Sequence, residues 1–190
     1  MFIELTDHLR CPAPHSEAFL VLLPHAVDGR RVVSGHLGCP VCGWGVSWED
    51  GTPDFGGGAA TQGTPPFDAA AAIAMLGLDG PGGWVATAGN AGSLAGDIAT
   101  LLPGVHVVAV NPPEGVRSAS AVSVIRSGSW PVKQHAMRGV VVGDDAGDVE
   151  RAVRSVLPGL RACGTGPRSE GGEFTLLASA GDAWVVVHNS

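Results

Sequence analysis

Two short cysteine-bearing turns constrain this chain more than any other feature of its sequence. Cys39 and Cys42 form a Cys-x-x-Cys turn between two strand-like runs, RVVSGHL and GVSWED. Upstream, Cys11 and His15 lie in a second, proline-rich turn. The Cys-x-x-Cys pair opens no helix, which sets it apart from a thioredoxin-like redox pair. Two turns that each supply a pair of sulfur or nitrogen donors favour a zinc ribbon instead.

We therefore predict one structural zinc ion with four protein ligands: Cys11, His15, Cys39 and Cys42. A site whose positions are all filled by protein stabilises the fold and leaves none open to a substrate. A redox pair and a metal-free arrangement are the two alternatives. Three other histidines compete with His15 for the fourth position, namely His8, His25 and His36. We expect His36 to point along its strand, away from the turn.

Composition limits the classes of partner. The chain has 190 residues, a formal net charge of −7 and a pI near 5.3, so a general attraction to nucleic acid or to an anionic membrane is not expected. There is no run of eighteen apolar residues and no secretory signal pattern. These features favour a cytoplasmic protein without a membrane span.

The composition changes after Phe55. Residues 56–66, GGGAATQGTPP, contain small residues, glycines and prolines, a pattern typical of a linker without packing side chains. We predict a zinc ribbon over 1–55, a linker over 56–66 and a second domain over 67–190. Because the linker shares no core with either side, we expect Cys39→Ser to unfold the ribbon and leave the second domain largely intact.

The second domain alternates in the α/β manner. Apolar periodicity predicts helices over 67–78, 93–102 and 148–157. Short β-branched runs predict strands over 82–89, 105–110, 120–128 and 137–143, followed by a hairpin over 174–180 and 183–189. The expected fold class is α/β, with a small zinc ribbon before a shortened Rossmann-like, mostly parallel sheet that ends in an antiparallel hairpin and is covered on both faces.

The first 55 residues resemble the small zinc-ribbon proteins that activate tRNA, rRNA and release-factor methyltransferases. The motifs that carry the resemblance are LTDHLRCP, the Cys-Pro-Val-Cys turn and the Asp-Gly-Thr-Pro that follows the second strand. The family often has Cys-Pro-x-Cys in its first turn, whereas Pro14 stands at that cysteine position here and His15 follows it.

About 120 further residues resemble the class I, Rossmann-like methyltransferases. The stretches VATAGNAGSLAGDIA and VVAVNPPEG correspond to the family's glycine-rich turn and to its ribose-binding strand end. The resemblance implies a crevice for S-adenosylmethionine, and four residues would contact that cofactor: Gly89, Asn90, Gly92 and Asn111.

The departures from that family bear on function. Only Gly89 falls in register with the family's three glycines, and Ala91 and Ser93 hold the other two places. Asn111 replaces the acidic residue that binds the ribose, and a neutral amide makes a weaker contact than a carboxylate. We therefore expect weak or absent binding of S-adenosylmethionine. No catalytic residue is assigned.

Three hypotheses for function follow. The favoured one is a non-catalytic or weakly active methyltransferase-like protein, a zinc-binding scaffold or a subunit that binds an unidentified protein partner. The alternatives are a divergent S-adenosylmethionine-dependent methyltransferase and another nucleotide-binding Rossmann-like enzyme. Asp144 and Asp145 follow a strand at the edge where such sites form, and we expect them to cap the next helix.

Overall fold

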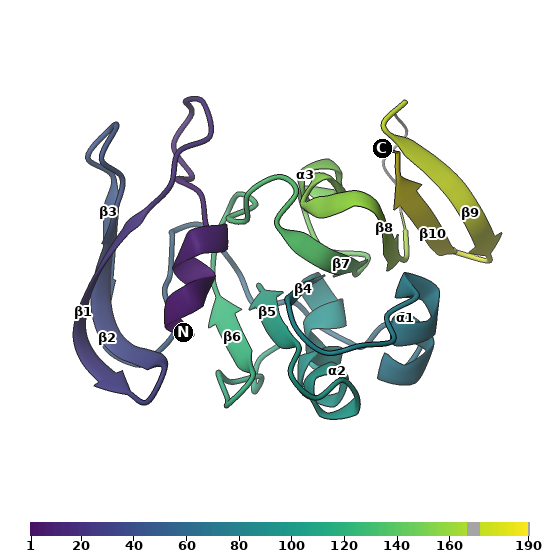
Figure 1. Ribbon diagram of the computed structural model, residues 1–190, viewed down its shortest axis with the longest axis horizontal. Helices are drawn as coiled ribbons and strands as arrows, with labels where there is room; N and C mark the ends of the chain where they lie inside the picture. Colours follow the sequence, from purple (N-terminus) through teal and green to yellow (C-terminus); the bar gives the residue numbers. More distant parts are fainter. Residues whose placement is uncertain (167–171, 190) are drawn as a thin grey trace.

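Two β-sheets make up the protein in a computed structural model, which describes residues 1–166 and 172–189. The smaller sheet is antiparallel and follows the chain order, β1 (Val21–Asp28), β2 (Arg31–Gly38) and β3 (Gly45–Trp48). A short 3-10 helix, η1 (Ile3–His8), precedes it and lies between the two sheets (Figure 1). This N-terminal part contains both cysteine-bearing turns.

The larger sheet has seven strands in the order β6-β5-β4-β7-β8-β10-β9. The first five strands in that order are parallel to their neighbours, and β10 is antiparallel to both β8 and β9. Their bounds are β4 (Trp84–Ala88), β5 (His106–Val110), β6 (Val122–Ile125), β7 (Met137–Val142), β8 (Val156–Gly164), β9 (Phe174–Ala180) and β10 (Ala183–His188). The mostly parallel sheet and its closing hairpin confirm the predicted fold class.

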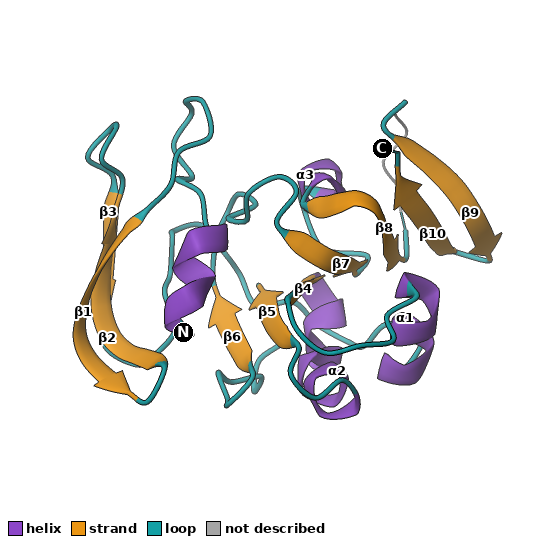
Figure 2. Cartoon of the chain, in the orientation of Figure 1, coloured by secondary structure: helices purple, strands orange, loops and turns teal. Residues whose placement is uncertain are grey.

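Three α-helices accompany this sheet on opposite sides (Figure 2). Two of them, α1 (Ala69–Leu76) and α2 (Ala95–Leu101), cover one face, and a 3-10 turn, η2 (Gly89–Leu94), leads into α2. Asp68 caps α1 by accepting a hydrogen bond from the amide of Ala71, as its position before an alanine run predicts. The third helix, α3 (Val149–Arg154), packs on β7 and β8 from the other side.

One predicted helix is too long. The pattern over 148–157 continues past Arg154, but the chain enters β8 at Val156. Pro158 and Gly159, which look like a helix stop, lie inside β8 instead. They fall where the pairing is irregular, because Met137 pairs with Val156 while Gly139 pairs with Arg161. A bulged segment of this kind accommodates a proline that a regular strand would exclude.

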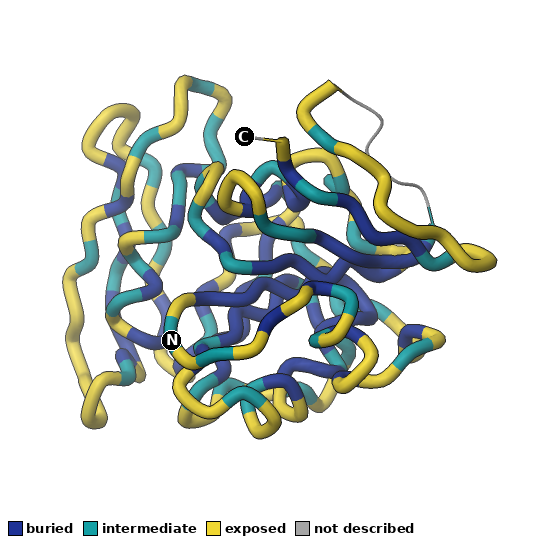
Figure 3. The backbone as a smooth tube through the Cα atoms, turned by 45° about the vertical axis from the view of Figure 1, so that its right-hand side comes forward, coloured by how far each residue is buried: buried dark blue, intermediate teal, exposed yellow. Residues whose placement is uncertain are grey.

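The second face of the seven-stranded sheet is covered largely by the N-terminal part of the chain. One buried cluster joins apolar residues of this part to those on the sheet's second face. Its N-terminal members include Met1, Phe2, Leu5, Leu9, Val32, Leu37 and Trp48, and its sheet members include Trp84, Ala86, Val108, Ile125, Val140 and Val142. The buried strands at the centre of Figure 3 are thus enclosed by α1 and α2 on one side and by the N-terminal part on the other.

Hydrogen bonds reinforce this packing. The amide of Phe2 donates to the buried hydroxyl of Ser123 on β6 at 2.9 Å. The amide of Arg10 donates to the carbonyl of Pro131, and the amide of Lys133 donates to the carbonyl of His8, each at 2.9 Å. The Phe2 ring also packs on His106, with ring centroids 4.3 Å apart. The two parts of the chain therefore share a core.

The predicted domain boundaries stay a prediction, but the shared core removes the reason to expect independent unfolding. The segment 56–66 also packs more closely than its composition suggests. Phe55 and Pro65 are buried at its ends, and the amide of Gly128 donates to the carbonyl of Gly56 at 2.7 Å. In the described part of the chain, no helix combines the length and the apolar character needed to cross a membrane.

The shared core gives a first testable prediction. Leu9 is fully buried in the shared cluster and forms a bridge with Val132. Leu9→Ala should lower the free energy of unfolding by about 2–5 kcal/mol, because it leaves a cavity between the two parts. Leu101→Ala on α2 is the control, since Leu101 is 53% exposed and its loss should change stability by less than about 0.5 kcal/mol. Urea unfolding measures both, and equal small losses would contradict the shared core.

Candidate metal centre and candidate cofactor crevice

The first cysteine-bearing turn follows η1. The amide of Cys11 donates to the carbonyl of Ala18 at 3.0 Å, which closes a loop that carries His15. The amide of Ala13 points at the Cys11 sulfur at 3.5 Å. On the His15 ring, Nδ1 lies 2.6 Å from the Ser16 carbonyl oxygen. Because a carbonyl only accepts, Nδ1 carries the proton and Nε2 is left free to bind a metal.

The second turn connects β2 to β3. The amide of Cys39 donates to the carbonyl of Trp44 at 2.7 Å, and the amide of Gly43 donates to the carbonyl of Cys39 at 3.0 Å. Gly43 has a φ of +73°, a left-handed conformation that glycine adopts without strain. This tight turn directs Cys39 and Cys42 toward the same point.

The two turns bring all four predicted ligands together. Their ligand atoms, one each from Cys11, His15, Cys39 and Cys42, lie within 4.8 Å of one another. The sulfurs of Cys11 and Cys42 are 3.7 Å apart, and the Cys39 sulfur is 3.6 Å from His15 Nε2. Tetrahedral zinc with bonds of about 2.3 Å to sulfur and 2.0–2.1 Å to nitrogen would require separations of about 3.8 and 3.6 Å. The cluster therefore has the dimensions of a zinc site.

The chemistry of the donors also fits a cation. Burial raises the pKa of the Cys11 thiol to about 12. Burial alone would also raise the pKa of Cys39, but hydrogen bonds from the backbone amides of Cys42 and Val41, with the neighbouring thiols, lower it to about 6. Without a metal, the thiols share protons because adjacent thiolates repel one another. A divalent cation removes that repulsion and displaces the protons.

The competing histidines lie elsewhere. His36 faces Ser47 across the β2–β3 pair, with Nδ1 3.0 Å from the hydroxyl oxygen, as expected for a side chain that points away from the turn. His8 packs on the Trp84 ring at a centroid distance of 5.7 Å. The two tryptophans of the ribbon are packing residues: Trp48 is buried, and Trp44 meets the Phe55 ring at 5.0 Å.

The metal centre gives the second prediction. Purified protein should contain one zinc per chain, and Cys42→Ser should lose most of it, because a hydroxyl is a poor substitute for a thiolate. His36→Ser is the matched control, since His36 lies on the same small sheet outside the cluster, and it should keep the zinc. Elemental analysis of the two variants measures the outcome. Zinc near zero in the wild-type protein, with freely reactive Cys39 and Cys42, would contradict the site.

The residues predicted to contact S-adenosylmethionine lie at the carboxyl ends of two neighbouring strands. Gly89, Asn90 and Gly92 follow β4 in η2, and Asn111 follows β5. The chain runs from β4 out to β6 and then returns to β7 on the other side of β4. Ligands in sheets of this order bind at such a reversal, outside the carboxyl ends of the strands. The sequence thus predicted the correct edge of the sheet.

The glycine turn at this edge is occupied by a side chain from the chain itself. Asp145, in the turn after β7, accepts a hydrogen bond from the amide of Asn90 at 2.9 Å. A Cβ atom placed on Gly89 would lie 2.5 Å from the same carboxylate oxygen. We expected Asp145 to cap α3, and that prediction is wrong, because Asp148 accepts the capping bond from the amide of Arg151. Its actual partner lies 55 residues away in sequence, beyond the reach of a local pattern.

Pro112 closes a second approach. A Cβ atom on Gly92 would lie 2.8 Å from the Pro112 Cα, so the backbone of η2 is already in contact with the turn after β5. The small residue at position 92 therefore allows the proline to pack closely. A cofactor would have to displace Pro112 to approach this part of the glycine turn.

Asn111 is engaged in holding the fold. Its Nδ2 donates to the Ser127 carbonyl at 2.7 Å, and its Oδ1 accepts from the Ser127 amide at 2.9 Å. This pair of bonds joins the ends of β5 and β6. Asn111 also has a φ of +52°, a left-handed conformation in which asparagine is enriched. Both observations explain an asparagine here without a ribose.

The segment 56–64, which we call the crevice strap, crosses the same edge of the sheet. A Cβ atom on Gly58 would overlap the Ser127 backbone nitrogen and lie 2.5 Å from Asn111 Oδ1. The hydroxyl of Thr61 donates to the Asn111 carbonyl at 3.1 Å. The glycines that suggested a flexible linker are thus needed for close backbone contact at Gly58.

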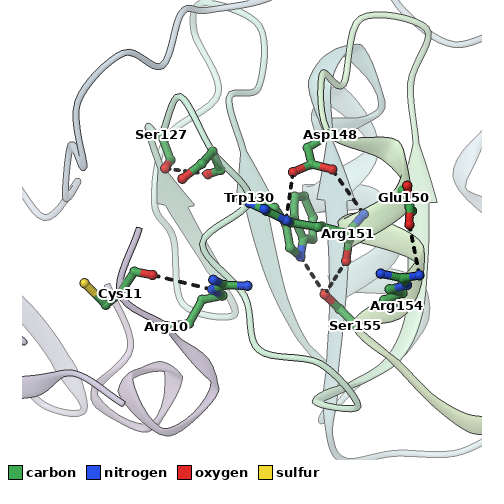
Figure 4. Close-up of polar contacts among 10 residues, drawn as sticks. Arg10, Cys11, Ser127, Trp130, Asp148, Glu150, Arg151, Arg154 and Ser155 are labelled. Atoms are coloured by element: carbon green, nitrogen blue, oxygen red, sulfur yellow. Dashed lines mark hydrogen bonds and ion pairs between the residues drawn. The ribbon is translucent and has the colours of Figure 1, made fainter. Parts of the chain in front are cut away.

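A pocket of about 220 Å³ remains between the strap, Asn111, Trp130 and Asp145. Pockets for drug-sized ligands usually occupy roughly 300–1,000 Å³. Figure 4 shows that Trp130 is fixed on one side of this region: its indole nitrogen donates to the Ser155 hydroxyl, which in turn donates to the Arg151 carbonyl. This wall is therefore held in place from behind.

Comparison with known proteins adds little to this description. No protein-family model and no curated protein matches the sequence. Among solved structures, a geranyl diphosphate methyltransferase in complex with GPP and sinefungin is similar, with 15% identity and a TM-score of 0.41 over 52% of this chain and 44% of that one. A predicted O-methyltransferase from Agrobacterium tumefaciens has 14% identity and a TM-score of 0.44 over 65% of this chain and 82% of that one. This chain thus matches less than half the length of the first of these.

Proposed function

We propose that this chain is a zinc-stabilised, non-catalytic methyltransferase-like protein that acts as a scaffold or partner-binding subunit in the cytoplasm. The observation that carries the proposal is the occupation of the crevice by the chain's own residues. Asp145 accepts from the Asn90 amide, Asn111 is bonded to Ser127, and the strap lies across the opening. Each contact uses a group that a bound cofactor would need.

The energetic argument rests on competition. A cofactor that used the Asn90 amide would first break its bond to the Asp145 carboxylate. Hydrogen bonds to charged groups contribute about 1.5–3 kcal/mol, which corresponds to roughly ten- to a hundredfold in affinity. Displacing Pro112 from Gly92 and the strap from Ser127 would add further cost. The same contacts weigh against a divergent methyltransferase and against another nucleotide-binding enzyme.

A binding role is supported by apolar side chains on the exposed surface of the N-terminal part. Phe19, Val21 and Leu23 are 57%, 52% and 60% exposed. Spaced two residues apart along an extended chain, they point to the same side. Clustered apolar exposure of this kind is typical of surfaces that bind another protein. The partner's identity is not part of the proposal.

The third prediction tests the proposed loss of cofactor binding. Calorimetric titration of the zinc-loaded protein with S-adenosylmethionine, and with its demethylated product, should give no measurable heat of binding. The physical reason is that the amide, the ribose position and the opening are all engaged within the chain. A dissociation constant in the low micromolar range for either compound would overturn the proposal in favour of a divergent enzyme.

The fourth prediction concerns the residue at the ribose position. If Asn111 only lacked a charge, Asn111→Asp would improve cofactor binding. We expect no gain and a loss of about 1–3 kcal/mol of stability, because aspartate cannot donate to the Ser127 carbonyl and would repel it.

Gln62→Glu on the exposed part of the strap is the control for this change of amide to carboxylate, and it should be nearly neutral. Denaturant unfolding and calorimetry measure stability and binding separately. A stable Asn111→Asp variant that binds S-adenosylmethionine would show that the crevice is open.

A further inference from the structure

The zinc ligands belong to the same buried cluster as the seven-stranded sheet. Cys11 and Cys39 are 1% and 3% exposed and are members of the cluster that contains Ala86 on β4 and Val140 on β7. Trp48 and Phe55, on either side of the ribbon's end, belong to it as well. No polar or solvent-filled layer is needed to separate the metal centre from the sheet's second face.

The sheet has little other cover on that face. Among the described residues, α3 is the one α-helix on this side, and its six residues contact β7 and β8. Over β4, β5 and β6 the cover comes from the segment that leads into the first zinc turn, through Phe2 on Ser123 and His106 and through His8 on Trp84. The second zinc turn is joined to the strap through the contact between Trp44 and Phe55.

We infer that zinc at Cys11, His15, Cys39 and Cys42 controls the folding of the seven-stranded sheet as well as that of the ribbon. Loss of the metal releases both turns and with them the layer that buries the sheet's second face. The chain therefore folds and unfolds as one zinc-dependent unit. This inference does not depend on the state of the cofactor crevice, so the two fail separately.

Linkage gives the inference a quantitative form. A ligand that binds only the folded state lowers the unfolded fraction in proportion to its free concentration, once that concentration exceeds the dissociation constant. Amides that exchange only through global unfolding report that fraction directly. The amides of β7 are suitable, since β7 is central and its residues from Gly139 to Val142 are buried.

The experiment is hydrogen exchange of the full-length protein in a series of zinc buffers, under conditions where refolding is faster than exchange. For β7 amides, each tenfold rise in free zinc should slow exchange about tenfold. The amides of Cys39 and Gly43 in the second zinc turn serve as the internal reference, because they report the ribbon itself. A zinc dependence at Cys39 and Gly43 with none at β7 would overturn the inference and restore two independent domains.

Two variants sharpen the test. Cys42→Ser should abolish the zinc dependence of β7 exchange and leave β7 weakly protected at every zinc concentration. His25→Ser is the matched control, because His25 is exposed on β1 and lies outside the ligand cluster, and it should keep the tenfold dependence. Because the wild-type titration alone decides the question, failure of Cys42→Ser to fold would not leave it open. Full β7 protection in zinc-free Cys42→Ser would contradict the inference.

Discussion

The burial of one sheet face by the N-terminal part of the chain is the constraint on which the rest of this structure depends. A mostly parallel sheet must be covered on both faces, because its strands carry apolar residues on each side. Here α1 and α2 cover one face, and a zinc-ribbon part, rather than a second set of helices, covers most of the other. A metal centre and a Rossmann-like sheet thus share one core.

This arrangement also explains the state of the crevice. The chain that leaves the ribbon at Phe55 must travel to α1, and its route passes over the carboxyl ends of β5 and β6. The strap is fixed there by the Gly128 amide and by the contact of Gly58 with Ser127. Short loops after β5 and β7 add Pro112 and Asp145. Packing of the second layer and closure of the crevice therefore follow from the same chain path.

Local patterns predicted much of the fold. Strand runs, the Asp68 cap and the four zinc ligands followed from spacing and residue type, because each depends on neighbours close in sequence. The start of β8 was missed, since Pro158 and Gly159 resemble a helix stop and only the pairing with β7 reveals a bulge. The roles of Asp145 and Gly58 depend on partners more than 50 residues away, which periodicity does not reveal. The shared core was missed for the same reason.

The central claim is that the ribbon and the sheet form one cooperative structure. Differential scanning calorimetry of the zinc-loaded, full-length protein tests it most directly, because a single two-state transition has equal calorimetric and van't Hoff enthalpies. The account predicts one transition with an enthalpy of about 130 kcal/mol near 60 °C for a chain of this length. Two resolved transitions, of which a chelator removes only the smaller, would contradict it.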